Sequence, residues 1–195
     1  MSKQTSTPAA PPAAETAAST TAVEARDFRR VLGRVPTSVA VVSTRGASGP
    51  VGMTVGSLTS VSLDPPLIAF FVNRGSQTMQ VIQEAGVFCV NVLGQDQGEI
   101  CRLFASSRRT EVGPEAWDSC CTGAPRLRDA LAWLECTVDS VFDAGDHLGV
   151  MGRVQHLTDA PGTQNPLVFY RGSLCRLHAA SARRVESHPL QWWDL

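Results

Sequence analysis

The sequence lacks several features that would assign a function class at once. Its 195 residues carry 17 Lys and Arg against 18 Asp and Glu, for a net charge of −1. Such a balance gives no strong attraction to nucleic acid or to a membrane surface. No apolar run is long enough to cross a bilayer, and the N-terminal residues lack the pattern of a secretory signal. We therefore expect a chain that binds neither nucleic acid nor membrane.

The cysteines and histidines also lack the spacings of common sites. Six cysteines are present, but no two form a C-x-x-C pair. Cys89 and Cys136 fall inside apolar strand patterns, and the adjacent Cys120 and Cys121 are poorly placed to bond to each other. This usage favours reduced thiols and a cytoplasmic location. The histidines show no metal-site spacing, so no metal is expected.

Familiar nucleotide and hydrolase motifs are missing as well. The chain contains neither G-x-G-x-x-G nor G-x-x-x-x-G-K-[ST], which hold dinucleotides and triphosphates. It contains no G-x-S-x-G nucleophile elbow, and no cysteine has an obvious partner base. Any nucleotide must therefore be held by another architecture.

What the sequence does contain is a series of short apolar runs that predict a mainly β chain with short helices. Residues 1–23 are almost entirely Ala, Thr, Ser and Pro, which predicts a disordered tail, and 24–195 should form one domain. The expected strands are Ser38–Thr44, Val51–Ser62, Leu67–Asn73, Val87–Leu93, Ala132–Phe142, Leu148–Leu157 and Pro166–Leu177. The expected helices are Val23–Val35, Ser76–Ala85 and Asp96–Ala105.

This order of elements favours a closed barrel over a doubly wound sheet, because closure removes exposed strand edges. The polar segment Ser106–Arg128 should be a long surface loop. The C-terminal Trp192 and Trp193 should dock on the domain or on a second subunit.

The segment from Gly52 to Thr78 carries the strongest functional signal. Its first part has strand composition but bears hydroxyls at Thr54, Ser57, Thr59, Ser60 and Ser62. Its last part places Arg74, Ser76 and Thr78 where a strand passes into a helix. An arginine, hydroxyls and free helix N-terminal amides suit a phosphate. The alternative is a capped helix with a solvated arginine, beside a strand with one wet face.

A second candidate is the tripeptide Gly145-Asp146-His147 between two apolar strands. Gly-Asp is common in hairpin turns, so one interpretation is a plain turn with an exposed histidine. The functional interpretation places His147 against an anionic or amide-bearing ligand at the barrel mouth.

Several segments in order resemble the flavin reductase-like family, the small reductase components of two-component flavin monooxygenases. They are FRRVLGRVPTSVAVV, PVGMTVGSLTSVSLDPPLIAFFVNRGSQT, FCVNVL, LFA, ALAWLEC, DAGDHLGVMGRV and PLVFYRG. The resemblance spans Phe28 to Leu177. It implies a split β-barrel of the FMN-binding type, usually a homodimer, with FMN or FAD as cofactor and NADH or NADPH as co-substrate.

The resemblance also implies site residues. Those along the flavin ring and ribityl chain would be Thr37, Ser38, Val39, Thr54, Val55, Gly56 and Ser57, with Phe104 close by. Those around the ribityl and phosphate end would be Asn73, Arg74, Gly75, Ser76 and Thr78. His147 would serve nicotinamide binding.

The activity implied by the resemblance is hydride transfer from NAD(P)H to flavin, which then passes to a partner monooxygenase. Because such chemistry belongs to the cofactor, the lack of a catalytic acid, base or nucleophile constellation is consistent with it. Two alternatives remain open at this stage. One is a flavin-binding carrier or sensor without turnover, and the other is a flavin-dependent oxidase or oxygenase with its own organic substrate.

Overall fold

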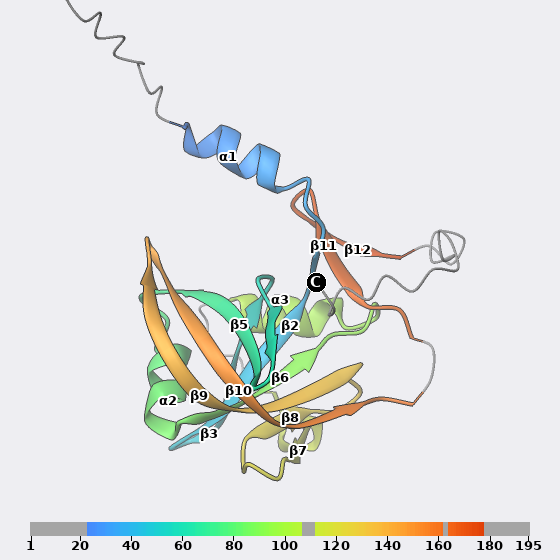
Figure 1. Cartoon of the computed structure of the whole chain (residues 1–195). Coiled ribbons are helices and arrows are strands. Elements are labelled where there is room, and N and C mark those ends of the chain that lie inside the picture. The colour runs from blue at the N-terminus through green and yellow to red at the C-terminus, as the bar shows by residue number, and fades with distance from the viewer. Residues whose placement is uncertain (1–22, 107–111, 162–163, 178–195) are drawn as a thin grey trace, which may run out of the picture.

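The protein is described by a computed structural model that covers residues 23–106, 112–161 and 164–177. The predicted tail, apart from Val23, and the paired Trp192 and Trp193 lie outside the described residues. The expected fold class, mainly β with short helices in a split β-barrel, is confirmed (Figure 1).

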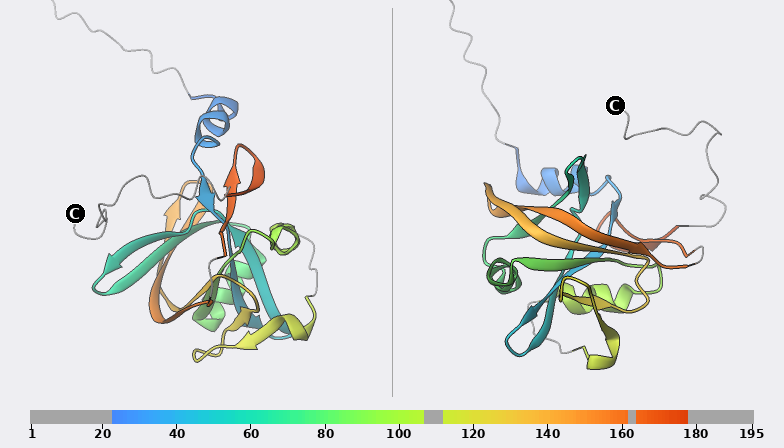
Figure 2. Two further views of the ribbon diagram at one scale, coloured as in Figure 1. Left: turned by 90° about the vertical axis from the view of Figure 1, so that its right-hand side faces the viewer. Right: turned by 60° about the horizontal axis from the view of Figure 1, so that its bottom comes forward.

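One antiparallel sheet of seven strands forms the body, in the order β3-β2-β6-β9-β10-β5-β4. Its strands are β2 (Ala40–Gly46), β3 (Gly49–Val55), β4 (Thr59–Leu63), β5 (Pro66–Asn73), β6 (Val87–Val92), β9 (Ala132–Ala144) and β10 (His147–Asp159). Register shifts in the β9–β10 ladder, at Met151/Gly152 and Val154/His156, let these two long strands bend. The sheet therefore curls strongly on itself (Figure 2).

Two expectations about this sheet were wrong in detail. The predicted single strand Val51–Ser62 is two strands, β3 and β4, which lie at opposite ends of the sheet. The barrel is also not closed by strand pairing, because β3 and β4 do not pair with each other. Instead, the Ser57 hydroxyl accepts from the Phe71 amide at 2.9 Å and donates to the Phe71 carbonyl at 3.2 Å. These two bonds connect the end of β3 to β5 across the split.

The core consists of two clusters on opposite sides of β2, which explains why that strand reads as continuously apolar. Ala40 and Val42 belong to the first cluster, whereas Val39 and Val41 belong to the second. The first cluster contains residues from strands across the whole sheet, including Phe70, Phe88 and Val150, so the curled sheet encloses it. The second cluster is covered by the elements that line the cleft described below.

Helix α2 (Gln77–Ala85) begins and ends as predicted. The Ser76 side chain caps it by accepting from the Met79 amide at 3.2 Å, and Gly86 ends it in the left-handed conformation at φ 68°. Met79 and Ile82 are buried in the first cluster. This packing fixes the N-terminus of α2 beside β3.

Helix α3 (Gly98–Ala105) covers the other side of β3. Cys101 is buried in the second cluster, and Ile100 and Phe104 pack against that cluster. The Thr54 hydroxyl donates to the Cys101 carbonyl at 2.8 Å. A strand hydroxyl that suggested a wet surface in the sequence therefore joins β3 to α3.

The predicted surface loop Ser106–Arg128 is folded over much of its described part. A 3-10 turn, η1 (Pro114–Ala116), leads into a hairpin of β7 (Trp117–Ser119) and β8 (Pro125–Leu127). Trp117 and Leu127 are buried in the second cluster. This segment is therefore a packed cover over β2 and β6, and the expectation of a plain surface loop was wrong.

A smaller sheet extends beyond the barrel, in the order β1 (Thr37–Ser38), β11 (Leu167–Tyr170) and β12 (Ser173–Arg176). The predicted strand Pro166–Leu177 is thus a hairpin of two strands. Helix α1 (Ala25–Leu32) precedes this sheet, contains no buried residue and projects from the body (Figure 1).

Candidate functional site

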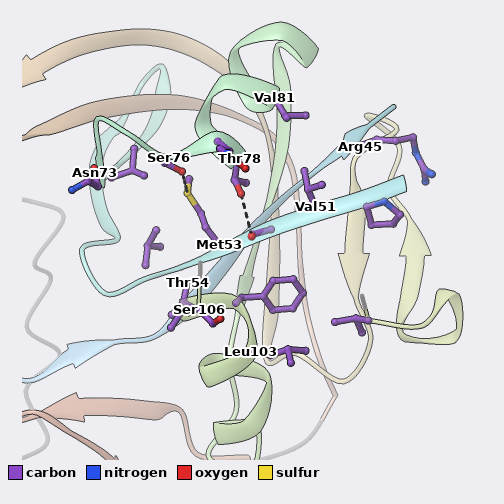
Figure 3. A pocket seen from close by; sticks show the side chains of 18 of the residues that line it. Arg45, Val51, Met53, Thr54, Asn73, Ser76, Thr78, Val81, Leu103 and Ser106 are labelled. Atoms are coloured by element: carbon purple, nitrogen blue, oxygen red, sulfur yellow. Dashed lines mark hydrogen bonds between the residues drawn. The ribbon is translucent and has the colours of Figure 1, made fainter. Parts of the chain in front are cut away.

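A large cleft of about 1190 Å³ runs along β3. Residues 50–57 form one wall, and the start of α2 and the end of β5 form the wall opposite. The end of α3 and strand β7 form the floor (Figure 3). The cleft therefore lies where the sheet is split, between elements that are far apart in the sequence.

Aromatic side chains give the cleft an apolar side. The rings of Phe104 and Trp117 pack edge to face with centroids 5.8 Å apart, and both residues line the cleft. Gly52 makes this packing possible, because a Cβ there would lie 3.1 Å from the Phe104 ring and 3.1 Å from Val41. The glycine in the GMT segment is thus explained by close approach of an aromatic ring.

Four hydroxyls of the cleft, those of Thr54, Ser57, Ser76 and Thr78, are already engaged with protein groups. Thr78 Oγ1 donates to the Gly52 carbonyl at 3.3 Å, which joins α2 to β3 (Figure 3). Ser76 Oγ contacts Met53 Sδ at 3.4 Å while it caps α2. With the bonds of Thr54 and Ser57 described above, these contacts fix the walls of the cleft. The sequence indicated a polar strand, and the structure shows that its hydroxyls form hydrogen bonds that join neighbouring elements.

The N-terminus of α2 opens onto the cleft. Ser76, Gln77 and Thr78 all line it, and the first amides of a helix have no partner within the helix. The preceding turn is shaped by Asn73, whose Oδ1 accepts from the Gly75 amide at 2.9 Å. A helix start of this kind favours an anionic group such as a phosphate.

Arg74 does not line the cleft in this structure. Its Nε donates to the Gly145 carbonyl at 2.8 Å, and its Nη1 lies 2.7 Å from Asp143 Oδ1. Both acceptors belong to the end of β9 and the β9–β10 turn. Arg74 therefore fastens the end of β5 to the turn that leads into His147.

His147 does line the cleft, at the first position of β10. Its Nδ1 lies 2.7 Å from Asp146 Oδ1. The hydrogen bond and the charge of His147 lower the pKa of the Asp146 carboxyl, so this acid is ionised at neutral pH. The ionised carboxylate can accept a hydrogen bond from Nδ1–H and so fixes the orientation of the ring.

The structure brings most of the predicted site residues to this one cleft. Those that line it are Thr54, Val55, Gly56, Ser57, Asn73, Gly75, Ser76, Thr78, Phe104 and His147. Thr37 lies beside the lining, since a Cβ on Gly56 would lie 3.3 Å from Thr37 Oγ1. Ser38 pairs with Val168 in the smaller sheet, and the side chain of Val39 is buried in the second cluster.

Sequence reasoning missed two sets of residues here. Arg45 and Ser48 line the cleft near the β2–β3 turn, where nothing in the local sequence marks them. Ser43 and Asn91 are buried polar residues that hold the β7–β8 hairpin over the second cluster. The polar Asn91 within the apolar run FCVNVL was the only available signal for this second set.

The cysteines do not form a nucleophilic site. All six are free thiols. A side-chain hydrogen bond with Cys120, together with burial, raises the pKa of Cys89, and burial raises the pKa of Cys136 to about 12. Both thiols therefore remain protonated at neutral pH. Across the described residues, no group of three or more His, Cys, Asp or Glu could hold a metal, and no helix has the length and apolar character to span a membrane.

Comparison with known proteins agrees with this architecture. Residues 32–178 match the family described as "Flavin reductase like domain". A flavin reductase from Pseudomonas putida is 41% identical over 152 residues, which cover 77% of this chain and 89% of that protein. The reductase subunit HsaB of a flavin-dependent monooxygenase from Mycobacterium tuberculosis is 38% identical, with 88% of this chain and 90% of that protein covered.

A solved structure with the same fold is the NADH:FAD oxidoreductase SgcE6 of Streptomyces globisporus, in complex with NAD and FAD fragments. Its TM-score is 0.74 at 33% identity, and the match covers 82% of this chain and 98% of that one. The match of the family over most of the described residues, together with these relatives, shows that the chain belongs to the flavin reductase-like family.

Proposed function

We propose that this protein is an NAD(P)H-dependent flavin reductase that supplies reduced flavin to a partner monooxygenase. The observation that carries the proposal is the cleft between β3 and α2, which gathers ten of the residues implied by the resemblance. The names of the relatives support the same reaction class, since they are reductases of flavin, and HsaB is the reductase subunit of a monooxygenase.

The residues of the cleft fit a flavin nucleotide. The volume of about 1190 Å³ is slightly above the usual range for small-molecule sites, which leaves room for a nucleotide cofactor. Phe104, Met53 and Val55 offer apolar contact to a ring system. The N-terminus of α2 offers amides to a phosphate. FMN or FAD would therefore be held with its ring toward residues 54–57 and its phosphate toward Ser76 and Thr78.

When bound, a flavin supplies the acceptor for a hydride from reduced nicotinamide. The protein's own task is to position both molecules. His147 stands at one end of the lining, and Nε2, the ring nitrogen that does not contact Asp146, is available to hydrogen-bond the carboxamide of nicotinamide. Asp146 and Arg74 hold this histidine and its turn in place. The Phe104–Trp117 pair keeps one side of the cleft apolar and poor in water.

Two measurements on the full chain test the proposal. Equilibrium titration should show binding of FMN or FAD, and stopped-flow mixing with NADH or NADPH should bleach the flavin absorbance. His147→Ala should slow bleaching by about tenfold through weaker nicotinamide binding, with flavin affinity unchanged. His156→Ala, at an exposed position of β10 outside the cleft, is the matched control.

The outcomes separate the candidate functions. Flavin binding without bleaching by either nicotinamide would contradict a reductase and support a carrier or sensor. Oxidation of an organic compound without a partner protein would support an independent oxygenase. Absence of flavin binding would contradict all three. The reduced thiols and the use of NAD(P)H support a cytoplasmic location for the proposed enzyme.

We also propose that the protein acts as a homodimer in which α1 packs on a second copy of the chain. An eight-residue helix is too short to persist alone in water. On α1 and just after it, Phe28 is 58% exposed, Val31 50% and Val35 55%. No described residue of the same chain covers these apolar side chains, and a second copy of the chain could cover them.

Light scattering on the full chain tests this arrangement. The wild type should have the mass of two chains, and Phe28→Asp with Val31→Asp should shift it toward one chain. Arg30→Ala, which removes only an exposed pair with Asp27, should leave the mass unchanged. A monomeric wild type would contradict the proposed dimer.

A further inference from the structure

Two of the ionisable side chains that line the cleft are paired with an oppositely charged group, and the third has no such partner among the described residues. Within the described lining, three residues carry ionisable side chains: Arg45, Asp118 and His147. Asp118 lies 2.9 Å from Arg128, and His147 lies 2.7 Å from Asp146. Arg45 has no ion pair or side-chain hydrogen bond with any residue that the structure describes. Among the described residues, Arg45 is thus the one charged side chain of the lining that has no oppositely charged partner.

The position of this charge is fixed by the strands. Arg45 pairs with Pro50 in the β2–β3 ladder, and both residues line the cleft. Thr78 at the start of α2 bonds to Gly52, two residues farther along β3. Two strand residues span about 7 Å. Arg45 therefore lies beyond the α2 N-terminus, on the side away from Asn73 (Figure 3), the residue that pairs with His147 in the β5–β10 ladder.

The surroundings of Arg45 suit the far part of a long ligand. Pro50, the cross-strand partner of Arg45, lies on the same face of the strand pair and also lines the cleft. Exposed Ser48 adds a hydroxyl to the same end of the cleft. A cation and a hydroxyl together can accept a phosphate.

We propose that Arg45 binds the second phosphate of FAD, the one that carries adenosine, and that this end of the cleft makes FAD the preferred flavin. The inference rests on the proposed function, because it takes the flavin ring to lie at residues 54–57 and the first phosphate at the start of α2. A ligand that continues along β3 past Thr78 reaches Arg45, whereas FMN ends at the first phosphate. An arginine that meets a phosphate forms charge-assisted hydrogen bonds.

Equilibrium titrations of the full chain with riboflavin, FMN and FAD test the proposal. The wild type should bind FAD about tenfold more tightly than FMN, which corresponds to about 1.4 kcal/mol. Arg45→Gln should raise the Kd of FAD about tenfold and the Kd of FMN less than twofold. Arg45→Lys should keep part of the preference for FAD. Arg153→Gln, which removes an arginine outside the cleft, should leave all three Kd values unchanged.

Several outcomes would overturn the assignment while leaving a flavin reductase intact. One is an equal loss of FMN and FAD affinity in Arg45→Gln, which would place Arg45 at the phosphate that both flavins share. A second is no change in either flavin. A third is a raised KM for NADPH with unchanged Kd for FAD, which would assign Arg45 to the nicotinamide nucleotide. Failure of the wild type to bind any flavin would instead contradict the proposed function itself.

Discussion

The two ends of the cleft are built in opposite ways. At the end near His147, polar side chains are tied to the protein: Arg74 to Asp143 and to the Gly145 carbonyl, and His147 to Asp146. At the end near the β2–β3 turn, Arg45 is exposed and has no described partner of this kind. An arginine lies near each end, but only the guanidinium of Arg74 is bonded to other described residues.

This difference separates two tasks that look the same in a sequence. An arginine beside a helix start predicts anion binding. The Arg74 guanidinium instead donates to the Gly145 carbonyl and to Asp143, at the β9–β10 turn of the same chain. Its effect on a ligand is therefore indirect, through the placement of His147. Loss of Arg45, in contrast, should change the affinity for a ligand directly. The comparison predicts that substitutions at the two ends should affect different ligands.

The largest effect is expected from a substitution at Asn91, which should loosen the β7–β8 hairpin that lines the cleft. Asn91 is fully buried, donates to the Val41 carbonyl at 2.8 Å and accepts from the Leu127 amide at 2.6 Å. Asn91→Leu keeps the volume but leaves the Leu127 amide without its partner and removes the side-chain donor to the Val41 carbonyl, at a cost of about 1–3 kcal/mol for each lost bond. We expect the free energy of unfolding, measured in urea, to fall by about 3 kcal/mol.

The same variant should weaken both flavins by a similar factor, because the β7–β8 hairpin carries Trp117 and Ser119 of the lining. Gln155→Ala is the control, since this exposed residue bonds only to Thr137 and to the Arg153 carbonyl. It should change stability by less than about 0.5 kcal/mol. A stable Asn91→Leu protein with unchanged flavin affinity would show that the hairpin does not depend on this network.

An effect of intermediate size is expected from a substitution of Arg74, near the His147 end of the cleft. Arg74→Met removes both bonds to the β9–β10 turn and should raise the KM for NADH about tenfold, with less than a twofold change in the Kd of FMN. The exposed ion pair itself should contribute about 1 kcal/mol or less to stability. Steady-state kinetics and FMN titration on the same preparation provide the two readouts.

Arg153→Met is the matched control for Arg74→Met, because it breaks an ion pair with Asp139 of β9, the strand that also carries the Arg74 partner Asp143. It should leave both KM and Kd unchanged. The opposite result at Arg74, a tenfold weaker FMN with an unchanged KM for NADH, would mean that its guanidinium leaves the turn and meets the phosphate.

The sequence predicted the parts of the fold that depend on local chemistry. Ser76 and Gly86 define α2 because a cap and a left-handed glycine act within one helix. The break between β3 and β4 was missed because residues 49–63 have strand composition throughout. Only the curl of the sheet sends the two halves to opposite edges, and that curl is set by strands far along the chain.

The candidate site divides in the same way. Gly52, Thr54 and Thr78 could be grouped from one segment because they lie on neighbouring elements of it. The engagement of Arg74 could not be predicted, since Asp143 and Gly145 lie about 70 residues away and approach only through the β5–β10 ladder. Arg45 and Asn91 likewise acquire their roles from tertiary neighbours that no local pattern indicates.

The smallest expected effect concerns Asp146, the exposed acid that orients His147. Asp146→Asn keeps the size of the side chain but removes the charge that holds a proton on Nδ1, so the KM for NADH should rise about threefold with little change in flavin affinity. The pKa of Asp146 is lowered by its hydrogen bond with His147. Its contribution is therefore complete above the ordinary aspartate pKa of about 3.9 and is lost as the pH falls through the lowered value.

The small difference in melting temperature between wild type and Asp146→Asn should accordingly be constant above about pH 5 and should shrink only below about pH 4. Asp143→Asn is a useful companion, because it alters the partner of Arg74 on the same turn without touching His147. If Asp146→Asn left the KM for NADH unchanged while Asp143→Asn raised it, the orientation of His147 would depend on the position of the turn. The hydrogen bond of the ring to its neighbouring carboxylate would then be unimportant for binding.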